Sequence, residues 1–533
     1  MVPVLRFLLI LFALVVLAPA QASRQRFYPD DPIWEVPAPK SVAQIKQRDV
    51  NALYDFTYQS FRSKERLQIP SGGINTLGEV PDSEWFTNRH AKKRMTRDEL
   101  QRGPGNENRP VAPFVGSGAK TQGITPGFSM RDARGGLYFV KTDPLSNPEM
   151  GTAADVIGSK FFYALGYNTP ENYILNLQRG DITIAENARI ESAGRERHMN
   201  AKDLQLILDN VPRRKDGTYR LLASLAVQGE PIGPFRYEGT RADDPNDTVP
   251  HDVRRDLRGL YVFSAWLNHT DSKAGNTLDV VVEEKGVRFV RHYLIDFGAT
   301  LGSDSDMPKN ARYGHEYIFP EGSKAIKSIA SLGLYSPDWE RAHYPDHLKA
   351  VGRFESKIFD PTTWTSNYPN PAFLSRQAED EYWGAKQVLT FTNQDIRALV
   401  ETGEYSDPRV VDYIVARLGE RRDKIGRAFL SNVLPLDAFR VSGDELLFDD
   451  LASNYGFSSP QQFRFRWFLF DNQTGTNTPV PDSTSSKLPA NVTNSATGSY
   501  VAAEIQASDP DKTVTVYLRK DASGWTPVGV RRK

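Results

Sequence analysis

Residues 266–298 read WLNHTDSKAGNTLDVVVEEKGVRFVRHYLIDFG, and the rest of the chain can be interpreted around them. The segment carries two groups of polar residues. Asp271, Lys273 and Asn276 are spaced as D-x-K-x-x-N, which places a carboxylate, an ammonium and a carboxamide on one short loop. Asp296 opens the tripeptide D-F-G after the apolar run 293–295, which predicts a short buried strand that ends at a cleft.

These side-chain types suit the transfer of a phosphoryl group from a nucleotide. A carboxylate such as Asp271 can accept a proton, and the ammonium of Lys273 can steady a phosphate. Oxygen atoms of Asn276 and Asp296 can bind Mg²⁺. Short patterns recur by chance in a long chain, so either motif alone is a weak signal and the two in this order are a stronger one. The alternative is that Asp271 and Asn276 cap a turn and that D-F-G ends a strand.

The two motifs resemble those of the protein-kinase-like superfamily, in which a catalytic loop with Asp and Asn five residues apart precedes D-F-G. His269, Thr270 and Asp271 stand where protein kinases have H-R-D. By motif the chain is most similar to the HipA-like and lipid-kinase-like bacterial members. The resemblance covers roughly residues 116–430 and implies a two-lobed kinase-like α+β fold.

The same resemblance implies transfer of the γ-phosphoryl group of ATP, with Mg²⁺ as the metal cofactor. Asp271 would orient or deprotonate an acceptor hydroxyl, and Lys273 would contact the transferred group. Asn276 and Asp296 would hold Mg²⁺. The arginine that precedes the catalytic Asp in protein kinases is missing here, which argues against the usual phosphate switch on an activation loop.

A glycine-rich passage and a lysine-bearing strand precede this segment, as in a kinase small lobe. Glycines let the backbone approach phosphates closely, but their spacing does not match G-x-G-x-x-G, so Gly123 and Gly127 are both candidates for this contact. Residues 137–141 read LYFVK, a predicted buried strand. Lys141 at its end would reach the α- and β-phosphates.

Residues 148–165 predict a helix that begins at a proline and ends at Gly166. The resemblance implies that an acidic residue of this helix holds Lys141. Asp155 is the first choice, because apolar residues share part of its helical face. It also lies eleven residues before Gly166, and the resemblance to HipA-type kinases implies an acidic residue at about that distance from the closing glycine. Glu149 is the alternative, and Asp155 would then be a solvated surface charge.

The second half of the predicted kinase-like body is mainly helical. Helices are predicted at residues 251–267, 382–389, 395–401 and 408–430, with Thr392 and Ser406 as the N-caps of the last two. The first of these helices leads directly into the D-x-K-x-x-N loop. A hairpin with its turn at 284–286 is predicted between this loop and D-F-G. Arg421 and Arg422 are predicted on a solvated helix face, with a phosphate-binding patch as the alternative.

Composition limits the class of protein. The chain has 533 residues with 66 basic and 66 acidic side chains, so no net charge steers it toward nucleic acid or an anionic membrane. Hydrophobic residues make up 39% and aromatic residues 11%, as in globular proteins. The chain contains no cysteine, which excludes disulfides and thiolate metal sites.

Residues 1–22 read MVPVLRFLLILFALVVLAPAQA, which predicts a secretory signal peptide with a small-x-small cleavage site. A retained membrane anchor is the alternative, but the apolar run is shorter than the ~20 residues that a span needs. An exported chain without cysteine is typical of bacteria, so we expect a periplasmic or extracellular location.

Five regions are predicted along the chain: the signal peptide 1–22, an N-terminal extension 23–110, a small lobe 111–228, a large lobe 229–435 and a β-sandwich-like domain 436–533. In the extension, residues 42–61 predict an amphipathic helix, and Trp85 and Phe86 are expected to dock on a larger body. The last domain is expected to contain a long flexible loop at 471–499, and could bind a partner or a glycan or merely pack.

The sequence thus predicts an ATP- and Mg²⁺-dependent phosphotransferase that acts outside the cytoplasm on an unknown hydroxyl acceptor of a protein, lipid or glycan. No A-P-E motif follows Gly298, so the acceptor side differs from protein kinases. Two alternatives remain open. One is a catalytically inactive kinase-like scaffold, and the other is transfer of AMP from the same cleft.

Overall fold

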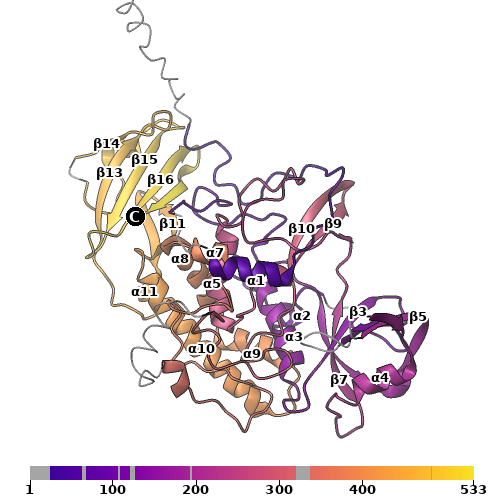
Figure 1. Cartoon of the computed structure of the whole chain (residues 1–533). Helices are drawn as coiled ribbons and strands as arrows, with labels where there is room; N and C mark the ends of the chain where they lie inside the picture. The colour runs from indigo at the N-terminus through magenta and orange to yellow at the C-terminus, as the bar shows by residue number, and fades with distance from the viewer. Residues whose placement is uncertain are drawn as a thin grey trace, which may run out of the picture.

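The structure is a computed structural model that describes residues 25–62, 68–105, 108–120, 127–192, 195–319, 337–481 and 483–533. The predicted signal peptide and Gly123 lie outside the described residues. The described chain is a mixed α/β structure with one large sheet, smaller sheets and several helices (Figure 1). None of the helices in this part of the chain is long and apolar enough to cross a membrane.

A seven-stranded sheet has the strand order β4-β7-β3-β2-β1-β5-β6. Strands β1 and β5 run parallel, and the other neighbours pair antiparallel. Lys141 of β3 stands opposite Gly127 of β2 on one side and Leu222 of β7 on the other. The strands are β1 (Phe114–Lys120), β2 (Gly127–Arg131), β3 (Leu137–Thr142), β4 (Asn172–Leu177), β5 (Ile182–Ser192), β6 (Arg195–His198) and β7 (Tyr219–Leu225).

Helix α3 (Met150–Ala164) lies between this sheet and a helical body, as the sequence predicts for residues 148–165. Val156 packs against Ile174 of β4 and Leu222 of β7. Phe161 on the other side of the helix belongs to the large apolar core of the helical body. Because both sides of α3 are covered, polar residues on it can be buried as well.

The helical body forms the largest apolar core of the described residues. Its helices are α5 (Arg255–Leu267), α7 (Pro371–Leu374), α8 (Ala378–Leu389), α9 (Asn393–Glu401) and α10 (Pro408–Leu430). Thr392 caps α9 through a capping box, as predicted. Helix α2 (Arg97–Arg102) packs against α9. Helix α4 (Ala201–Leu208) packs against the large sheet.

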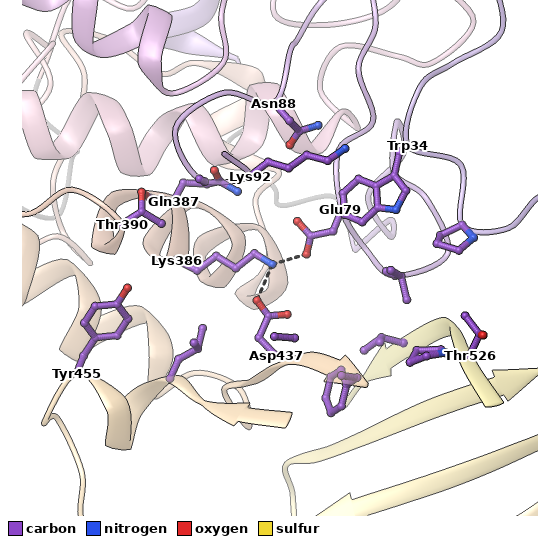
Figure 2. A pocket seen from close by; sticks show the side chains of 18 residues that line it. Trp34, Glu79, Asn88, Lys92, Lys386, Gln387, Thr390, Asp437, Tyr455 and Thr526 are labelled. Carbon is purple, nitrogen blue, oxygen red and sulfur yellow. Dashed lines mark hydrogen bonds and ion pairs between the residues drawn. The ribbon is translucent and has the colours of Figure 1, made fainter. Parts of the chain in front are cut away.

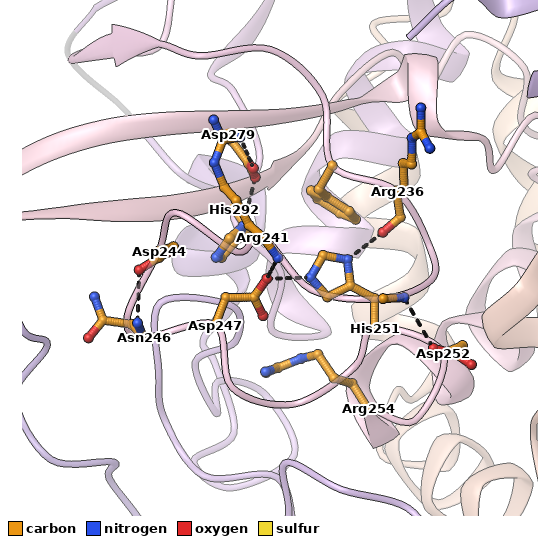
Figure 3. Close-up of polar contacts among 12 residues, drawn as sticks. Arg236, Arg241, Asp244, Asn246, Asp247, His251, Asp252, Arg254, Asp279 and His292 are labelled. Carbon is orange, nitrogen blue, oxygen red and sulfur yellow. Dashed lines mark hydrogen bonds and ion pairs between the residues drawn. The ribbon is translucent and has the colours of Figure 1, made fainter. Parts of the chain in front are cut away.

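Strands β9 (Thr277–Glu284) and β10 (Val287–Leu294) form the predicted hairpin, with Lys285 and Gly286 at its turn. The short strand β8 (Glu230–Pro231) pairs with β9. A buried polar network fastens the hairpin to the chain before α5 (Figure 3). In it, Asp279 accepts a hydrogen bond from the Arg241 guanidinium at 2.9 Å and pairs with His292 Nδ1 at 2.7 Å.

The N-terminal segment completes this network with an aromatic side chain. Trp85 stacks on the His292 ring with a centroid separation of 3.5 Å. Phe86 packs against Tyr167 and Trp383 in the large core. The predicted docking of Trp85 and Phe86 on a larger body is therefore confirmed.

The C-terminal region is built on an antiparallel sheet with the order β14-β13-β15-β16-β17, coloured yellow in Figure 1. One face shares an apolar core with the hairpin β11–β12, and the other face packs on Phe27 of the N-terminal segment. The strands are β11 (Leu436–Ser442), β12 (Glu445–Asp450), β13 (Arg464–Phe470), β14 (Asn477–Pro479), β15 (Tyr500–Gln506), β16 (Thr513–Asp521) and β17 (Gly524–Arg532). The domain boundaries at 110, 228 and 435 stay predictions.

Some elements differ from the sequence prediction. The helix predicted at 42–61 is confined to α1 (Ala52–Phe61), because backbone hydrogen bonds hold the preceding residues against other segments: Val42 N–H donates to the Arg288 carbonyl of β10 and Arg48 N–H to the Ile232 carbonyl. The segment 471–499 is more structured than a flexible loop, since it contains β14 and α12 (Ala490–Thr493). Helix α10 is capped by Asp407 rather than Ser406, because the Asp407 carboxylate accepts from Arg409 N–H.

Candidate active site

Hairpin β9–β10 brings the two sequence motifs side by side. The D-x-K-x-x-N loop ends where β9 begins and D-F-G follows β10, so Thr277 pairs with Leu294 across the hairpin. The residues just beyond this pair are joined as well, because Ile295 N–H donates to the Asn276 carbonyl at 3.0 Å. The hairpin therefore fixes the separation between the two motifs.

Lys141 joins three elements at the site. Its Nζ lies 2.9 Å from Asp155 Oδ2 of α3 and 2.7 Å from Asp296 Oδ1 after β10. Glu149, the alternative partner, lies elsewhere and accepts hydrogen bonds from Ser406. The structure thus places Asp155 against Lys141, and Asp155 is only 2% exposed rather than on a solvated surface.

The surroundings of Asp155 hold its carboxylate in one orientation. Its Oδ1 accepts from Asn172 Nδ2 at 2.9 Å and from Phe297 N–H at 3.3 Å. Burial raises the pKa of Asp155, and the nearby Lys141 opposes this shift. Asn172 is a supporting residue that sequence reasoning missed, because nothing in its local pattern marks it.

Asp296 differs from Asp155 in exposure and in backbone conformation. Its side chain is 42% exposed, and its backbone φ of 61° lies in the left-handed region that non-glycine residues seldom adopt. Desolvation by the surrounding protein raises the pKa of Asp296. The positive charges of Lys141 and Lys273 outweigh this effect and hold the pKa below its usual value. Asp296 is therefore an ionised carboxylate that can be reached from outside.

Burial lowers the pKa of Lys141, but the two carboxylates outweigh this effect and raise the pKa above its usual value. Lys141 therefore stays charged near neutral pH. Gly127, opposite Lys141 on β2, has no room for a side chain, since a Cβ there would lie 2.5 Å from the Val140 carbonyl oxygen. Gly127 thus has a structural reason to be glycine, apart from any contact with phosphate.

The D-x-K-x-x-N residues contact one another at the same end of the hairpin. Lys273 Nζ lies 2.9 Å from Asp271 Oδ2, and Asn276 Nδ2 donates to the same oxygen at 3.0 Å. Asn367 approaches the other carboxylate oxygen of Asp271 at 3.5 Å. The Asp271 side chain is about a fifth exposed, so an external hydroxyl could reach it.

A buried lysine lies behind Asp271. Lys309 Nζ donates to Thr270 Oγ1 at 2.7 Å and to the Ala299 carbonyl at 3.1 Å, which links the residue before Asp271 to the residue after Gly298. Burial lowers the pKa of Lys309. Burial also lowers the pKa of the neighbouring His269 to about 4, so His269 is neutral at pH 7. Sequence reasoning missed Lys309, because no local motif marks it.

Arg421 is not on a solvated face, and that prediction was wrong. It is buried and donates to the carbonyls of Ala265 and Trp266 at the end of α5, and to that of Glu355. The last turn of a helix leaves carbonyls without partners, and a guanidinium can satisfy several at once. Arg421 therefore secures the end of α5 from which the D-x-K-x-x-N loop begins.

The donor set fits Mg²⁺ only when a further ligand is present. Within the described residues, no group of three or more His, Cys, Asp or Glu side chains could hold a metal ion. Mg²⁺, however, commonly takes one or two protein carboxylates together with water and substrate phosphates. The exposed Asp296 carboxylate and the Asn276 carboxamide match that pattern, so these two residues would hold Mg²⁺ together with a phosphate-bearing ligand.

A comparison with protein-family models finds no match, and neither does a comparison with curated proteins. Among solved structures, the chain is similar to CtkA, a proinflammatory kinase of Helicobacter pylori. The similarity covers 61% of this chain and 95% of the other at 10% sequence identity, with a TM-score of 0.32. A TM-score of this size does not establish a shared fold or activity.

Proposed function

We propose that the chain is a phosphotransferase of two-lobed kinase-like fold that uses ATP and Mg²⁺. The observation that carries the proposal is the Lys141 ammonium held between the carboxylates of Asp155 and Asp296. In kinase-like enzymes a strand lysine paired with a helix acid contacts the phosphates, and the D-F-G aspartate holds the metal. Lys141, Asp155 and Asp296 come from distant parts of this sequence and lie in the same kind of arrangement.

In the proposed reaction, Asp271 takes the proton of an acceptor hydroxyl while the hydroxyl oxygen bonds to the γ-phosphorus of ATP. The bond from this phosphorus to the β–γ bridging oxygen breaks, and ADP leaves. The 3.0 Å hydrogen bond from Asn276 orients the Asp271 carboxylate, and Lys273 contacts the transferred group. Mg²⁺ held by Asn276 and Asp296 would neutralise phosphate charge.

Lys141 has a second role in this proposal. Its ammonium neutralises Asp296 at 2.7 Å, so a metal ion at Asp296 would compete with it. We expect Lys141 to keep its bond to Asp155 and to exchange Asp296 for phosphate oxygens when ATP and Mg²⁺ bind. Gly123 and Gly127 are the proposed backbone contacts to the phosphates.

The proposed acceptor is a hydroxyl group of a protein, lipid or glycan outside the cytoplasm of a bacterium. The sequence of residues 1–22 and the lack of cysteine support export. Between Ala299 and Phe319 the described chain forms turns, with an isolated bridge between Ser303 and Pro308, and the sequence has no A-P-E motif there. The acceptor side thus differs from that of protein kinases, and the proposal includes all three classes of acceptor.

The direct test is transfer of radiolabel from ATP to fractions of a cell-envelope extract. Label from γ-labelled ATP should appear in an acceptor, and label from α-labelled ATP should not. Transfer of the α label would show that AMP is the transferred group. Absence of transfer from either label, in a protein that binds ATP, would support the scaffold instead.

A further inference from the structure

A cavity of about 600 Å³ lies where three parts of the chain meet, and none of the site residues described above lines it (Figure 2). Its walls come from the N-terminal segment, from α8 and from the C-terminal region around β11 and β17. Small-molecule sites commonly enclose about 300–1,000 Å³ and combine apolar walls with a few polar groups. The proposed phosphotransferase reaction assigns this cavity no role.

The walls of the cavity are held in place by hydrogen bonds between distant segments. The Trp34 carbonyl accepts from Asp82 N–H at 2.9 Å, and the neighbouring Val36 N–H donates to the Asp82 carbonyl at 2.9 Å. Val530 N–H of β17 donates to the Thr76 carbonyl at 2.9 Å, which ties the C-terminal sheet to the N-terminal segment. A ligand would therefore meet a preformed cavity and spend little free energy on ordering it.

The charged groups of the lining balance one another. They are two ammonium groups, Lys92 and Lys386, and two carboxylates, Glu79 and Asp437. Lys386 lies between both carboxylates, 3.0 Å from Asp437 and in an ion pair with Glu79. The lining thus has no excess charge to attract an anion or a cation, and this favours a neutral ligand.

Two aromatic rings stand at opposite ends of the cavity in Figure 2, with the ion pairs of Lys386 between them. Trp34 is 36% exposed and Tyr455 is 41% exposed. Lys92 Nζ lies 4.2 Å from the centroid of the Trp34 ring, so it covers part of one face of the indole and holds the ring in position. The part of each aromatic ring that stays exposed is suited to contact the apolar face of a ligand ring.

Uncharged polar groups complete the lining: Asn88, Gln387 and Thr390. They provide both donors and acceptors, and the ion-paired carboxylates have further acceptor capacity. A sugar ring matches this combination, because it has apolar C–H faces and hydroxyl groups around its edge. We infer that the cavity binds a neutral oligosaccharide of two or more rings, with one ring on Trp34 and another near Tyr455.

The test is calorimetric titration of the full-length chain with uncharged hexasaccharides of glucose in α-1,4 and β-1,4 linkage and of β-1,4-linked N-acetylglucosamine, with hexagalacturonate as the charged probe. At least one neutral probe should bind saturably at one site. Trp34→Ala should weaken this binding about tenfold or more, as loss of a central aromatic contact does, whereas Trp34→Phe should retain most of it. Tyr455→Ala should also weaken binding.

Tyr58→Ala is the matched control, because Tyr58 is 46% exposed and does not line the cavity. It should leave saccharide affinity unchanged, and circular dichroism should show that each variant is folded. If Trp34→Ala fails to fold, Tyr455→Ala carries the comparison. No saturable binding of any neutral probe, binding of hexagalacturonate alone, or neutral binding that survives Trp34→Ala and Tyr455→Ala would overturn the inference.

Discussion

At the residue scale, the site depends on one lysine that neutralises two carboxylates of different character. Asp155 is buried and receives two further hydrogen bonds, while Asp296 is partly exposed and receives its one described hydrogen bond from Lys141. Removing one partner of a buried ion pair leaves the other charge uncompensated. The exposed carboxylate is thus the one that can exchange Lys141 for a metal ion, and the buried one keeps the lysine in position.

Replacing Asp271 by Asn separates catalysis from nucleotide binding. Asp271→Asn removes the proposed proton acceptor but keeps the size of the side chain, so kcat should fall by about 10²- to 10⁴-fold. The Kd for ATP should stay near that of the unaltered protein, because in the proposed reaction Asp271 contacts the acceptor and not the nucleotide. Turnover with γ-labelled ATP and a parallel ATP titration measure the two quantities. Equal loss of both would contradict the assigned role.

His269 predicts a pH dependence of stability. Burial lowers its pKa to about 4, below the ordinary value of about 6.5. Because the folded-state pKa is the lower one, the contribution of His269 is complete above about pH 6.5 and is lost as the pH falls toward 4. At about 1.4 kcal/mol per pKa unit, the loss amounts to roughly 3 kcal/mol.

Urea unfolding of the unaltered protein and of His269→Leu, measured between pH 7 and 4, checks this dependence. The free energy of unfolding should fall less steeply with pH in His269→Leu. The control is His198→Leu, because His198 on β6 is exposed and its removal should leave the slope unchanged. Identical slopes for the unaltered protein and His269→Leu would show that His269 is not buried in its neutral form.

Sequence reasoning works at this scale where the chemistry is local. Asp271, Lys273 and Asn276 lie within six residues of one another, so their spacing alone places them on one loop, and they contact one another in the structure. Lys309 and Arg421 could not be found in this way, since each contacts backbone or hydroxyl groups far away in the sequence. Such contacts leave no periodicity and no motif.

At the element scale, the β9–β10 hairpin determines the relation between the two motifs. Regular structure was predictable where the pattern is strong: the hairpin turn, α3, α5 and α10 lie within a few residues of their predicted positions. Strand β6 was not predictable, because all four of its residues are exposed and no apolar alternation marks it. The amphipathic pattern of residues 42–61 corresponds to two different local structures. Its second half forms α1, and its first half is not helical and packs on the β9–β10 hairpin.

The polar network below the hairpin should contribute much of its stability. Asp279→Leu removes the carboxylate that pairs with His292 and that lies 2.9 Å from the buried Arg241 guanidinium. The free energy of unfolding should therefore fall by about 3–5 kcal/mol. Glu284→Leu is the matched control on the same strand, because its ion pair with Arg291 is partly exposed and should be worth about 0–1 kcal/mol. Denaturant unfolding of both variants tests the difference, and similar losses would contradict it.

At the scale of the whole molecule, the N-terminal segment connects the regions. Phe27 packs on the C-terminal sheet, Val42 packs on the β9–β10 hairpin, and Phe86 lies in the core of the helical body. The sequence predicts an extension that docks aromatic residues, but it could not predict where they dock, because these contacts join residues far apart in the sequence. The cavity lined by Trp34 and Tyr455 is a product of the same long-range packing.

Deletion of the residues after 435 should spare nucleotide binding, because every candidate site residue precedes this point. Stability should fall, since Lys386 loses Asp437 and the apolar side chain of Phe27 loses the sheet that covers it. Thermal unfolding and ATP titration of the truncated chain measure both effects. A folded truncation that no longer binds ATP would place part of the nucleotide site in the C-terminal region.

The most direct test of the proposed site is thermal unfolding of the full-length chain with ATP, with and without Mg²⁺, for the unaltered protein and for Asp296→Asn. Ligand at 100 times its Kd stabilises a folded protein by about 2.7 kcal/mol. The unaltered protein should show this ATP-dependent stabilisation only when Mg²⁺ is present, and Asp296→Asn should lose it while remaining folded. If Asp296→Asn retains the full stabilisation by ATP and Mg²⁺, Asp296 is not the metal ligand and the proposed site is wrong.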